Sequence, residues 1–343
     1  MFERRGAVGL ITLNRPKALN ALTHGMVVAM HAQLKAWAVD DAVGCVVIQG
    51  TGERAFCAGG DIRALYESGK SGTAYIHDFY RDEYLLNAYI KHYPKPYMAL
   101  LSGIVMGGGV GVSMHGSYRV ADKSTVFAMP ETGIGLFPDV GGSFFLPRLP
   151  GEIGMYLGLT GARLKVDDLR YCKMATDADT DVGRDRIIAA LVAGDVPGNL
   201  MSEVTGYSIA SPAPLAPLSQ VRKKIDDFFA AGSVEDVLSR LDADASDWSA
   251  DTARTILSKS PTATKLAFRQ IREGAKLDFD DCMRMEFRMV NRVIAGHDFY
   301  EGVRATIIDR DGAPNWRPAT LAEVSDADID AYFALLGDKE LPL

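Results

Sequence analysis

Residues 129–142 read Met-Pro-Glu-Thr-Gly-Ile-Gly-Leu-Phe-Pro-Asp-Val-Gly-Gly, and they carry the two most unusual acids of the chain. Glu131 and Asp139 lie eight residues apart in a stretch that is otherwise apolar and rich in glycine and proline. Each acid follows a proline, which fixes the local backbone and therefore the direction of the next side chain. Either acid alone is equally well explained as a turn or cap residue. Because acids are rarely buried without a partner or a function, the pair favours a functional role.

Two glycine-rich segments precede these acids, and each directly follows a predicted strand. They are residues 55–61, Ala-Phe-Cys-Ala-Gly-Gly-Asp, and the triplet 107–109. Glycine allows a close approach of the backbone, and N–H groups at the start of a helix point outward with the positive end of the helix dipole behind them. A single triplet is more often a tight turn, but two such loops could each give one N–H to a thioester oxygen, as an oxyanion hole requires.

Other kinds of site are less well supported by the sequence. No Lys-Ser/Thr pair follows the glycine triplet, which excludes a P-loop. Cys57 is a candidate nucleophile, but no histidine lies near it in sequence, so a small buried residue is the better interpretation. The six histidines form no His-x-His or His-Glu-x-x-His pattern, and Gly-x-Ser-x-Gly is missing.

The composition restricts the class of protein. Of the 343 residues, 48% are hydrophobic and 24% are charged, as in ordinary soluble globular proteins. The net charge of −7 argues against general binding of nucleic acids, and no apolar run is long enough to span a bilayer, so we expect no membrane partner. A strand-like run begins at Val8, and we therefore expect no targeting segment.

The cysteines predict a reducing compartment. The four residues are far apart and form no Cys-x-x-Cys pair; they are Cys45, Cys57, Cys172 and Cys282. We expect neither a disulfide framework nor a metal site, and we expect a cytoplasmic location.

Strand and helix patterns alternate through the first half, which indicates an α/β layer structure. The expected strands are 8–13, 45–48, 97–101, 119–121 and 126–128, and the expected helices there are 23–39, 73–91 and 110–114. Beyond about residue 165 the periodicity becomes helical, with helices expected near 217–231, 233–242, 249–259, 261–275 and 278–295. Residues 208–217 are rich in proline and serine and suggest a linker or long loop.

In four short segments, the chain resembles the crotonase (enoyl-CoA hydratase/isomerase) superfamily. The segments are 9–16, 55–61, 107–109 and 129–131, within a resemblance that covers roughly residues 5–200 in order and spacing. The resemblance implies a spiral of ββα units with an acyl-CoA site over residues 1–200 and a mainly helical region over 201–343. Members of the family are often trimers or hexamers, so a homo-oligomer is also implied.

The resemblance assigns roles to particular residues. The oxyanion N–H groups of the family map onto Gly60 and Gly108, and its catalytic acids map onto Glu131 and Asp139. Glu83 matches a position that contacts substrate, and together with Gly108, Glu131 and Asp139 it completes the implied substrate-binding set. No cofactor is implied, because coenzyme A is part of the substrate.

The coenzyme A moiety would lie beside Ala58 and residues 17–19. Four further segments, 81–87, 106–111, 127–142 and 145–149, together with residues 115–116, resemble the branch of the superfamily that hydrolyses 3-hydroxyisobutyryl-CoA. This implies cleavage of that thioester, or of a similar short 3-hydroxyacyl-CoA, to the free acid and CoA, as in valine degradation.

One departure from the family pattern separates hydrolysis from water addition. Similar hydratases use two glutamates, of which one matches Glu131 and the other would fall at Gly111, where this chain has no side chain. Without a second acid there, water cannot be held and protonated in the hydratase manner. Glu131 is then either the nucleophile or the general base, and Asp139 would bind the substrate hydroxyl and help to protonate the departing thiolate. Two alternatives are an enoyl-CoA hydratase or isomerase and a non-catalytic acyl-CoA-binding subunit.

Overall fold

The computed structural model describes residues 1–179, 183–195 and 216–343. The chain forms two compact units, each assembled from separate stretches. Unit 1 consists of Met1–Gly60, Leu86–Ala128 and Arg163–Gln220, and unit 2 consists of Asp61–Leu85, Met129–Ala162 and Val221–Leu343. The predicted boundary between residues 200 and 201 lies outside the described residues, as do positions 208–215 of the predicted linker.

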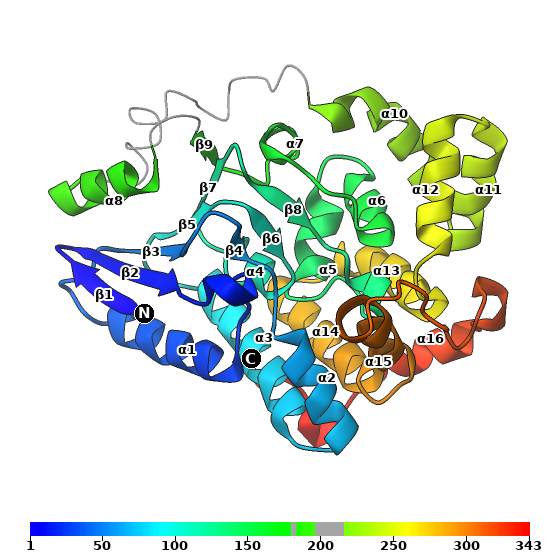
Figure 1. The fold of residues 1–343 in the computed structure, drawn as a ribbon, viewed down its shortest axis with the longest axis horizontal. Coiled ribbons are helices and arrows are strands. Elements are labelled where there is room, and N and C mark those ends of the chain that lie inside the picture. Colours follow the sequence, from blue (N-terminus) through cyan, green and yellow to red (C-terminus); the bar gives the residue numbers. More distant parts are fainter. Residues whose placement is uncertain (180–182, 196–215) are drawn as a thin grey trace. The chain divides into compact units, whose positions relative to one another are not determined.

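Unit 1 is built on two sheets (Figure 1). The larger sheet has the order β1-β2-β3-β5-β7-β9, with strands Phe2–Arg5, Val8–Leu13, Cys45–Gly50, Tyr97–Leu101, Tyr118–Asp122 and Asp177–Asp179. The smaller sheet has the order β4-β6-β8, with strands Ala55–Cys57, Ile104–Met106 and Val126–Ala128. All strand pairs are parallel except β1 with β2.

The order of the strands in the chain produces the spiral. β3 and β4, β5 and β6, and β7 and β8 are consecutive pairs, and each pair gives its first strand to the larger sheet and its second to the smaller sheet. Helices α2 (Ile62–Ser71) and α3 (Tyr75–Lys91) follow β4, and α4 (Gly108–Gly111) follows β6. The predicted α/β fold of wound ββα units is confirmed.

Both faces of the larger sheet are covered by helices. Figure 1 shows α8 (Arg184–Ala193) above β2 and α1 (His24–Ala38) below it. On the α8 side, Leu10 and Val47 belong to a buried cluster with Ile187. On the α1 side, Gly9 lies so close to Trp37 that a Cβ atom on the glycine would fall 2.7 Å from the indole ring. Burial on both faces explains why these strands are continuous apolar runs rather than alternating ones.

The remaining elements are short or helical. Unit 1 also contains η1 (Pro16–Ala18) and α7 (Val166–Tyr171). Residues 129–162 form η2 (Glu131–Ile134), α5 (Gly142–Phe145), η3 (Leu146–Arg148) and α6 (Ile153–Thr160). The C-terminal part forms α10 (Pro217–Phe229), α11 (Val234–Asp244), α12 (Asp247–Leu257), α13 (Pro261–Gly274), α14 (Phe279–Val293), α15 (Asp298–Val303), the π-helix η4 (Arg304–Ile308), η5 (Leu321–Glu323), α16 (Asp326–Phe333) and η6 (Gly337–Lys339).

The C-terminal helices begin where the sequence offers a side-chain cap. Ser233, Ser246, Ser260 and Asp278 precede α11, α12, α13 and α14, and each side chain accepts a hydrogen bond from a backbone N–H three residues on. Such caps satisfy donors that have no partner inside the helix. The helices predicted beyond residue 216 are confirmed with small shifts of their ends. No helix among the described residues is long and apolar enough to cross a membrane.

The structure differs from the sequence expectation at several places, three of which are described here. Ala55–Cys57, expected as part of a loop, is the short strand β4, because it pairs with β6. The helix expected over 110–114 begins earlier, at the second glycine of the triplet, and ends at Gly111. Strand β1 was not expected, because every one of its residues is exposed and its sequence has no apolar alternation.

Candidate active site

The two glycine-rich loops lie beside each other in unit 1. Strands β4 and β6 are parallel neighbours, so their C-terminal ends meet at the same edge of the smaller sheet. A Cβ atom on Gly109 would lie 2.3 Å from the carbonyl oxygen of Cys57, and one on Gly59 would lie 3.7 Å from the backbone nitrogen of Gly108. Glycine is needed at position 109 because the first turn of α4 packs directly on the β4 backbone.

The predicted oxyanion donors, Gly60 and Gly108, have backbone N–H groups suited to an external acceptor. Gly108 is the first residue of α4, a position whose N–H has no partner inside the helix. Within residues 1–179, 183–195 and 216–343, no hydrogen-bond acceptor is recorded for the N–H of Gly60 or of Gly108. Their assignment as an oxyanion hole stays a prediction.

Asn20 holds the first loop and was missed by the sequence analysis. This buried amide donates hydrogen bonds to the carbonyl oxygens of Thr51 at 3.0 Å and Ala55 at 2.8 Å. The N–H of Ala58 also donates to the carbonyl oxygen of Leu19 at 3.0 Å. The two segments predicted to lie by coenzyme A are therefore brought together. Asn20 could not be recognised because its partners are more than thirty positions away in the chain.

Unit 2 contains a cluster of buried acids. Glu131 opens η2 and is 5% exposed, Asp139 is 4% exposed, and Glu83 of α3 is 2% exposed. Among the described residues, neither Glu83 nor Asp139 forms an ion pair with a basic side chain.

The Tyr84 hydroxyl donates a hydrogen bond to Asp139, at 3.0 Å from its Oδ2 atom. Burial raises the pKa of Asp139 to about 7, and the hydrogen bond from Tyr84 opposes part of that rise. Burial and the charge of Asp139 likewise raise the pKa of Tyr84 well above its ordinary value, so Tyr84 stays a donor. At neutral pH the Asp139 carboxyl can therefore exist in both protonation states.

Two further polar groups in this cluster have no hydrogen-bond partner among the described residues. They are the buried hydroxyl of Tyr80 and the buried Oε1 atom of Glu83. Burial raises the pKa of Tyr80, and the charges of Asp139, Glu83 and Glu131 raise it further. Burial, with the charge of Asp139 added, also raises the pKa of Glu83 well above its ordinary value. Buried polar groups are nearly always satisfied, so this cluster is suited to a polar ligand.

The sequence contained a signal for Tyr80 and Tyr84 that was not used. The spacing of positions 80, 83 and 84 puts these side chains on one face of a helix, and all three are buried in α3. A helix that is polar and aromatic yet buried on one face indicates a site rather than a surface.

The segment that carries Glu131 is fixed by packing against the C-terminal region. A Cβ on Gly135 would lie 2.3 Å from the backbone of Asp298, and one on Gly302 would lie 2.5 Å from that of Ile134. The backbone of η2 therefore lies directly against α15, which explains the glycines at both positions.

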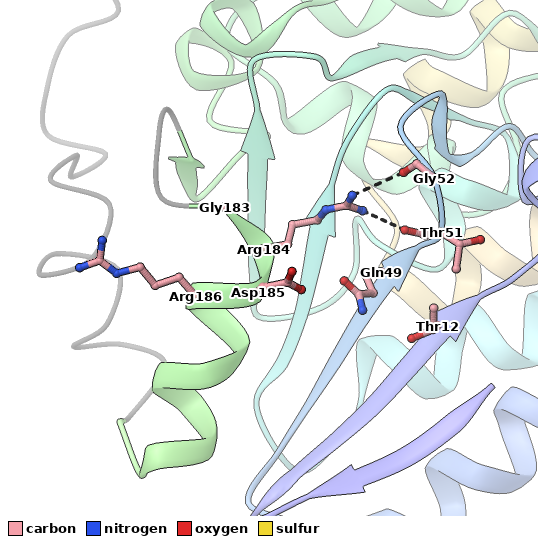
Figure 2. Close-up of a pocket in the computed structure, with 9 residues that line it drawn as sticks. Thr12, Gln49, Thr51, Gly52, Gly183, Arg184, Asp185 and Arg186 are labelled. Atoms are coloured by element: carbon pink, nitrogen blue, oxygen red, sulfur yellow. Dashed lines mark hydrogen bonds between the residues drawn. The ribbon is translucent and has the colours of Figure 1, made fainter.

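The pocket in Figure 2, about 650 Å³ in unit 1, contains none of the predicted site residues. It is lined by Thr12, Gln49, Gly50, Thr51, Gly52, Gly183, Arg184, Asp185 and Arg186. Figure 2 shows Arg184 reaching the Gly50–Gly52 turn, where its guanidinium donates to the carbonyl oxygens of Gly50 at 2.8 Å and Gly52 at 3.4 Å. Arg184 thus ties α8 to the ends of the strands.

The cysteines and potential metal ligands complete the description. All four cysteines are buried, and none forms a disulfide within the described part of the chain. The Cys57 thiol lies 3.5 Å from the carbonyl oxygen of Gly59, which agrees with a structural role. In the described part of the chain, no group of three or more histidine, cysteine or acidic side chains is arranged to hold a metal ion.

Curated relatives match this chain along its whole length. A protein of Danio rerio is 47% identical over 349 residues, covering 100% of this chain and 91% of the relative, and a protein of Homo sapiens is 42% identical over 346 residues, covering 99% and 90%. Both are named "3-hydroxyisobutyryl-CoA hydrolase, mitochondrial".

Two solved structures share the fold closely. A carnitinyl-CoA dehydratase from Mycobacterium thermoresistibile has a TM-score of 0.92 and 42% identity, covering 100% of this chain and 98% of that one. An enoyl-CoA hydratase from Rhodobacter sphaeroides 2.4.1 has a TM-score of 0.92 and 36% identity, with coverage of 100% and 99%. Their titles describe addition or removal of water, whereas the curated relatives are named hydrolases.

The names of the relatives also correct the predicted location. A cytoplasmic location is contradicted, because these relatives are mitochondrial proteins. Buried free cysteines indicate a reducing environment, and more than one compartment provides one, so the cysteine argument could not separate them.

The family assignment follows from the extent of the match. The sequence pattern of the family described as "Enoyl-CoA hydratase/isomerase" matches residues 8–333, which include both glycine loops, both acids and most of the C-terminal helices. The chain belongs to the enoyl-CoA hydratase/isomerase family.

Proposed function

We propose that this chain hydrolyses the thioester of 3-hydroxyisobutyryl-CoA to the free acid and CoA. The observation that carries the proposal is the full-length similarity, at 42–47% identity, to relatives that are all named for this reaction. Hydrolysis of this thioester is a step in valine degradation, and we propose that the chain acts in that pathway.

The thioester oxygen is assigned to the backbone N–H groups of Gly60 and Gly108. Attack on the thioester carbon turns its carbonyl oxygen into an oxyanion, and fixed donors stabilise that charge as it develops. The neighbouring loops and the absence of a recorded acceptor for either N–H support the assignment. Loss of one such donor typically costs ~10²–10³ in rate.

Glu131 is assigned the attack itself. As a nucleophile its carboxylate would form a mixed anhydride with the acyl group and expel the CoA thiolate, and water would then cleave the anhydride. As a general base it would instead take a proton from water as the water attacks the thioester. Either route consumes one water and releases the carboxylic acid and free CoA thiol.

Asp139 is assigned two tasks, binding of the 3-hydroxyl and protonation of the departing thiolate. A carboxyl with a pKa of about 7 is partly protonated at neutral pH, so it can supply that proton. The hydrogen bond from Tyr84 engages Oδ2, and Oδ1 is assigned to the substrate hydroxyl. The buried Glu83 completes the proposed contacts with the acyl group. A site that pairs the substrate hydroxyl should strongly reject acyl groups that lack it.

The proposal needs only protein groups, water and the acyl-CoA itself, so we assign no cofactor. A homo-oligomer, trimeric or hexameric as the family resemblance implies, forms part of the proposal.

Water addition to an enoyl-CoA is the second candidate, because the two solved structures carry such titles. Gly111 argues against it, since the position that matches the second hydratase acid has no side chain. The hydrolase is therefore preferred.

Release of free thiol across a panel of acyl-CoA thioesters tests the two candidates directly. We expect rapid thiol release from 3-hydroxyisobutyryl-CoA and little loss of the enoyl absorbance of crotonyl-CoA. Rapid hydration of crotonyl-CoA without thiol release would overturn the proposal in favour of the hydratase. Binding of acyl-CoA without either reaction would indicate a non-catalytic subunit.

A further inference from the structure

Glu286 is a buried carboxyl that the proposed reaction does not use. It lies on α14 and is 0% exposed. Its Oε2 atom accepts a hydrogen bond from the N–H of Gly141 at 2.8 Å, and its Oε1 atom accepts one from the N–H of Ser143 at 2.9 Å. The Ser143 hydroxyl donates to the same Oε1 atom. Three donors thus converge on one carboxyl, and all belong to the turn that directly follows Asp139.

The backbone of this turn has a conformation that needs support. Val140 has a φ of 51° and Gly141 has a φ of 88°. A positive φ at a β-branched residue is a strained outlier that persists only where the surroundings enforce it. Glu286 accepts a hydrogen bond from the N–H of Gly141, the residue after Val140, so it is placed to hold this turn.

On the N-terminal side of Asp139, a side chain of α13 binds the backbone. The buried Gln270 side chain donates from Nε2 to the carbonyl oxygen of Pro138 at 2.6 Å. The end of α13 also lies against this segment, since a Cβ on Gly274 would meet the Ser143 carbonyl oxygen at 2.0 Å. Asp139 therefore lies between two stretches of backbone that side chains of the C-terminal helices bind.

We propose that Glu286 is a positioning residue that fixes the Asp139 carboxyl by holding the 140–143 turn, with Gln270 securing Pro138 on the other side. The inference rests on the proposed function, because it takes the 3-hydroxyl of the substrate as the group that Asp139 binds. A relaxed turn would shift the carboxyl, and a displacement of ~1 Å at a reacting group can cost ~10²-fold in rate.

A merely structural role would give a different pattern of losses. If Glu286 only stabilised the fold, its loss would lower activity on every acyl-CoA alike and in every background. If it acts through Asp139, its loss should weaken selectivity for the 3-hydroxyl and have no further effect once Asp139 is disabled. Non-additivity of this kind is the signature of two groups in one unit.

The test compares wild type, E286Q, D139N and the double variant by thiol release. Glutamine keeps the shape of Glu286 but turns an NH₂ group toward one of the N–H donors. We expect E286Q to lower kcat/KM for 3-hydroxyisobutyryl-CoA by ~10–10²-fold. For isobutyryl-CoA, which lacks the hydroxyl but still needs its thiolate protonated, the loss should be clearly smaller than for 3-hydroxyisobutyryl-CoA, and on either substrate E286Q should add less than ~3-fold to D139N.

Two more variants keep the outcome decisive. E273Q makes the same change at a partly exposed position of α13, where Glu273 pairs with Arg269, and it should leave activity within ~2-fold of wild type. S143A removes one hydrogen-bond donor to Glu286 and should reduce selectivity for the 3-hydroxyl in the same way but to a smaller extent. It replaces E286Q in the test if E286Q fails to fold.

Equal losses on both substrates, or a full loss in the D139N background, would overturn the inference. An inactive wild type would overturn the proposed function as well.

Discussion

The glycine loops of unit 1 and the acid cluster of unit 2 place their functional groups in two different ways. In the loops the proposed functional groups are backbone N–H groups, and strand pairing between β4 and β6 fixes them. In the cluster they are carboxyls and hydroxyls, and side chains of α3, α13 and α14 fix them. In the first arrangement the two strands that pair lie just before the glycines they position, whereas the second depends on side chains up to 145 positions away.

The difference predicts where substitutions act. A backbone donor can be displaced only by moving the backbone, so its sensitive positions are the glycines that allow close packing. A carboxyl can be removed or retuned by a single conservative change, so its sensitive positions are the acid itself and its hydrogen-bond partners. The predictions below test each half of this comparison.

The largest effect is expected from E131Q, which keeps the shape of the side chain and removes both possible reactions of the carboxylate. We expect kcat for 3-hydroxyisobutyryl-CoA to fall by at least ~10³-fold with a small change in KM. Thiol release measures the effect, and E67Q at an exposed position of α2 is the matched control. Turnover within ~10-fold of wild type would mean that the acid cluster does not carry out the attack.

G109A should give the next largest effect and tests the glycine loops. The added methyl would lie 2.3 Å from the Cys57 carbonyl oxygen, so α4 must move and take the Gly108 N–H with it. We expect kcat to fall by ~10²-fold and the free energy of unfolding to fall by ~1–3 kcal/mol. The control is G25A, because nothing lies within 4 Å of a Cβ at Gly25. Equal activity of the two variants would show that the Gly108 donor is not needed.

The same contrast explains how much the sequence could predict. The glycine loops and the proline-flanked acids were found because each signal is contained in a few consecutive residues. Strands such as 8–13 were found because both faces are buried and the run is continuously apolar. The acids Glu131 and Asp139 are buried as their apolar surroundings indicated.

The supporting residues could not be predicted, because their partners are distant in sequence. Glu286 and Gln270 lie on amphipathic helices, where an internal polar residue has no distinguishing neighbour in the sequence. Tyr84 becomes meaningful only once the fold brings α3 to Asp139. β1 was missed because an exposed edge strand has no apolar pattern.

The pH dependence of stability should change in D139N. Burial raises the pKa of Asp139 to about 7 in the folded protein from its ordinary value of 3.8, so the folded state holds a proton that the unfolded state loses between those pH values. This contribution to stability is present below about pH 4 and is lost as pH rises through 7. D139N removes the ionisation, so its stability relative to wild type should increase from pH 5 to pH 8, by on the order of 1–3 kcal/mol.

Urea denaturation midpoints at several pH values measure this change in stability. Burial raises the pKa of both Glu83 and Glu286, and the charge of Asp139 raises both further, so loss of that charge in D139N strengthens the trend. D242N, at an exposed position of α11, is the control. Parallel loss of stability in D139N and wild type would show that Asp139 does not titrate in this range.

The smallest effect is expected from Y84F, which leaves every acid in place and removes only the donor to Asp139 Oδ2. That hydrogen bond favours the charged carboxyl, so its loss should raise the pKa of Asp139 above about 7. If protonated Asp139 delivers the proton to the thiolate, the alkaline limb of the kcat profile should move to higher pH, by up to ~1 unit. We expect kcat at neutral pH to fall only ~3–10-fold, because the loosened carboxyl is less well oriented although more of it is protonated.

Y93F, which removes a hydroxyl bonded to the Leu34 carbonyl oxygen at 3.2 Å, should leave the profile unchanged. A shift of the limb to lower pH would mean that Asp139 acts in its charged form, as a binding group for the hydroxyl and not as the proton donor.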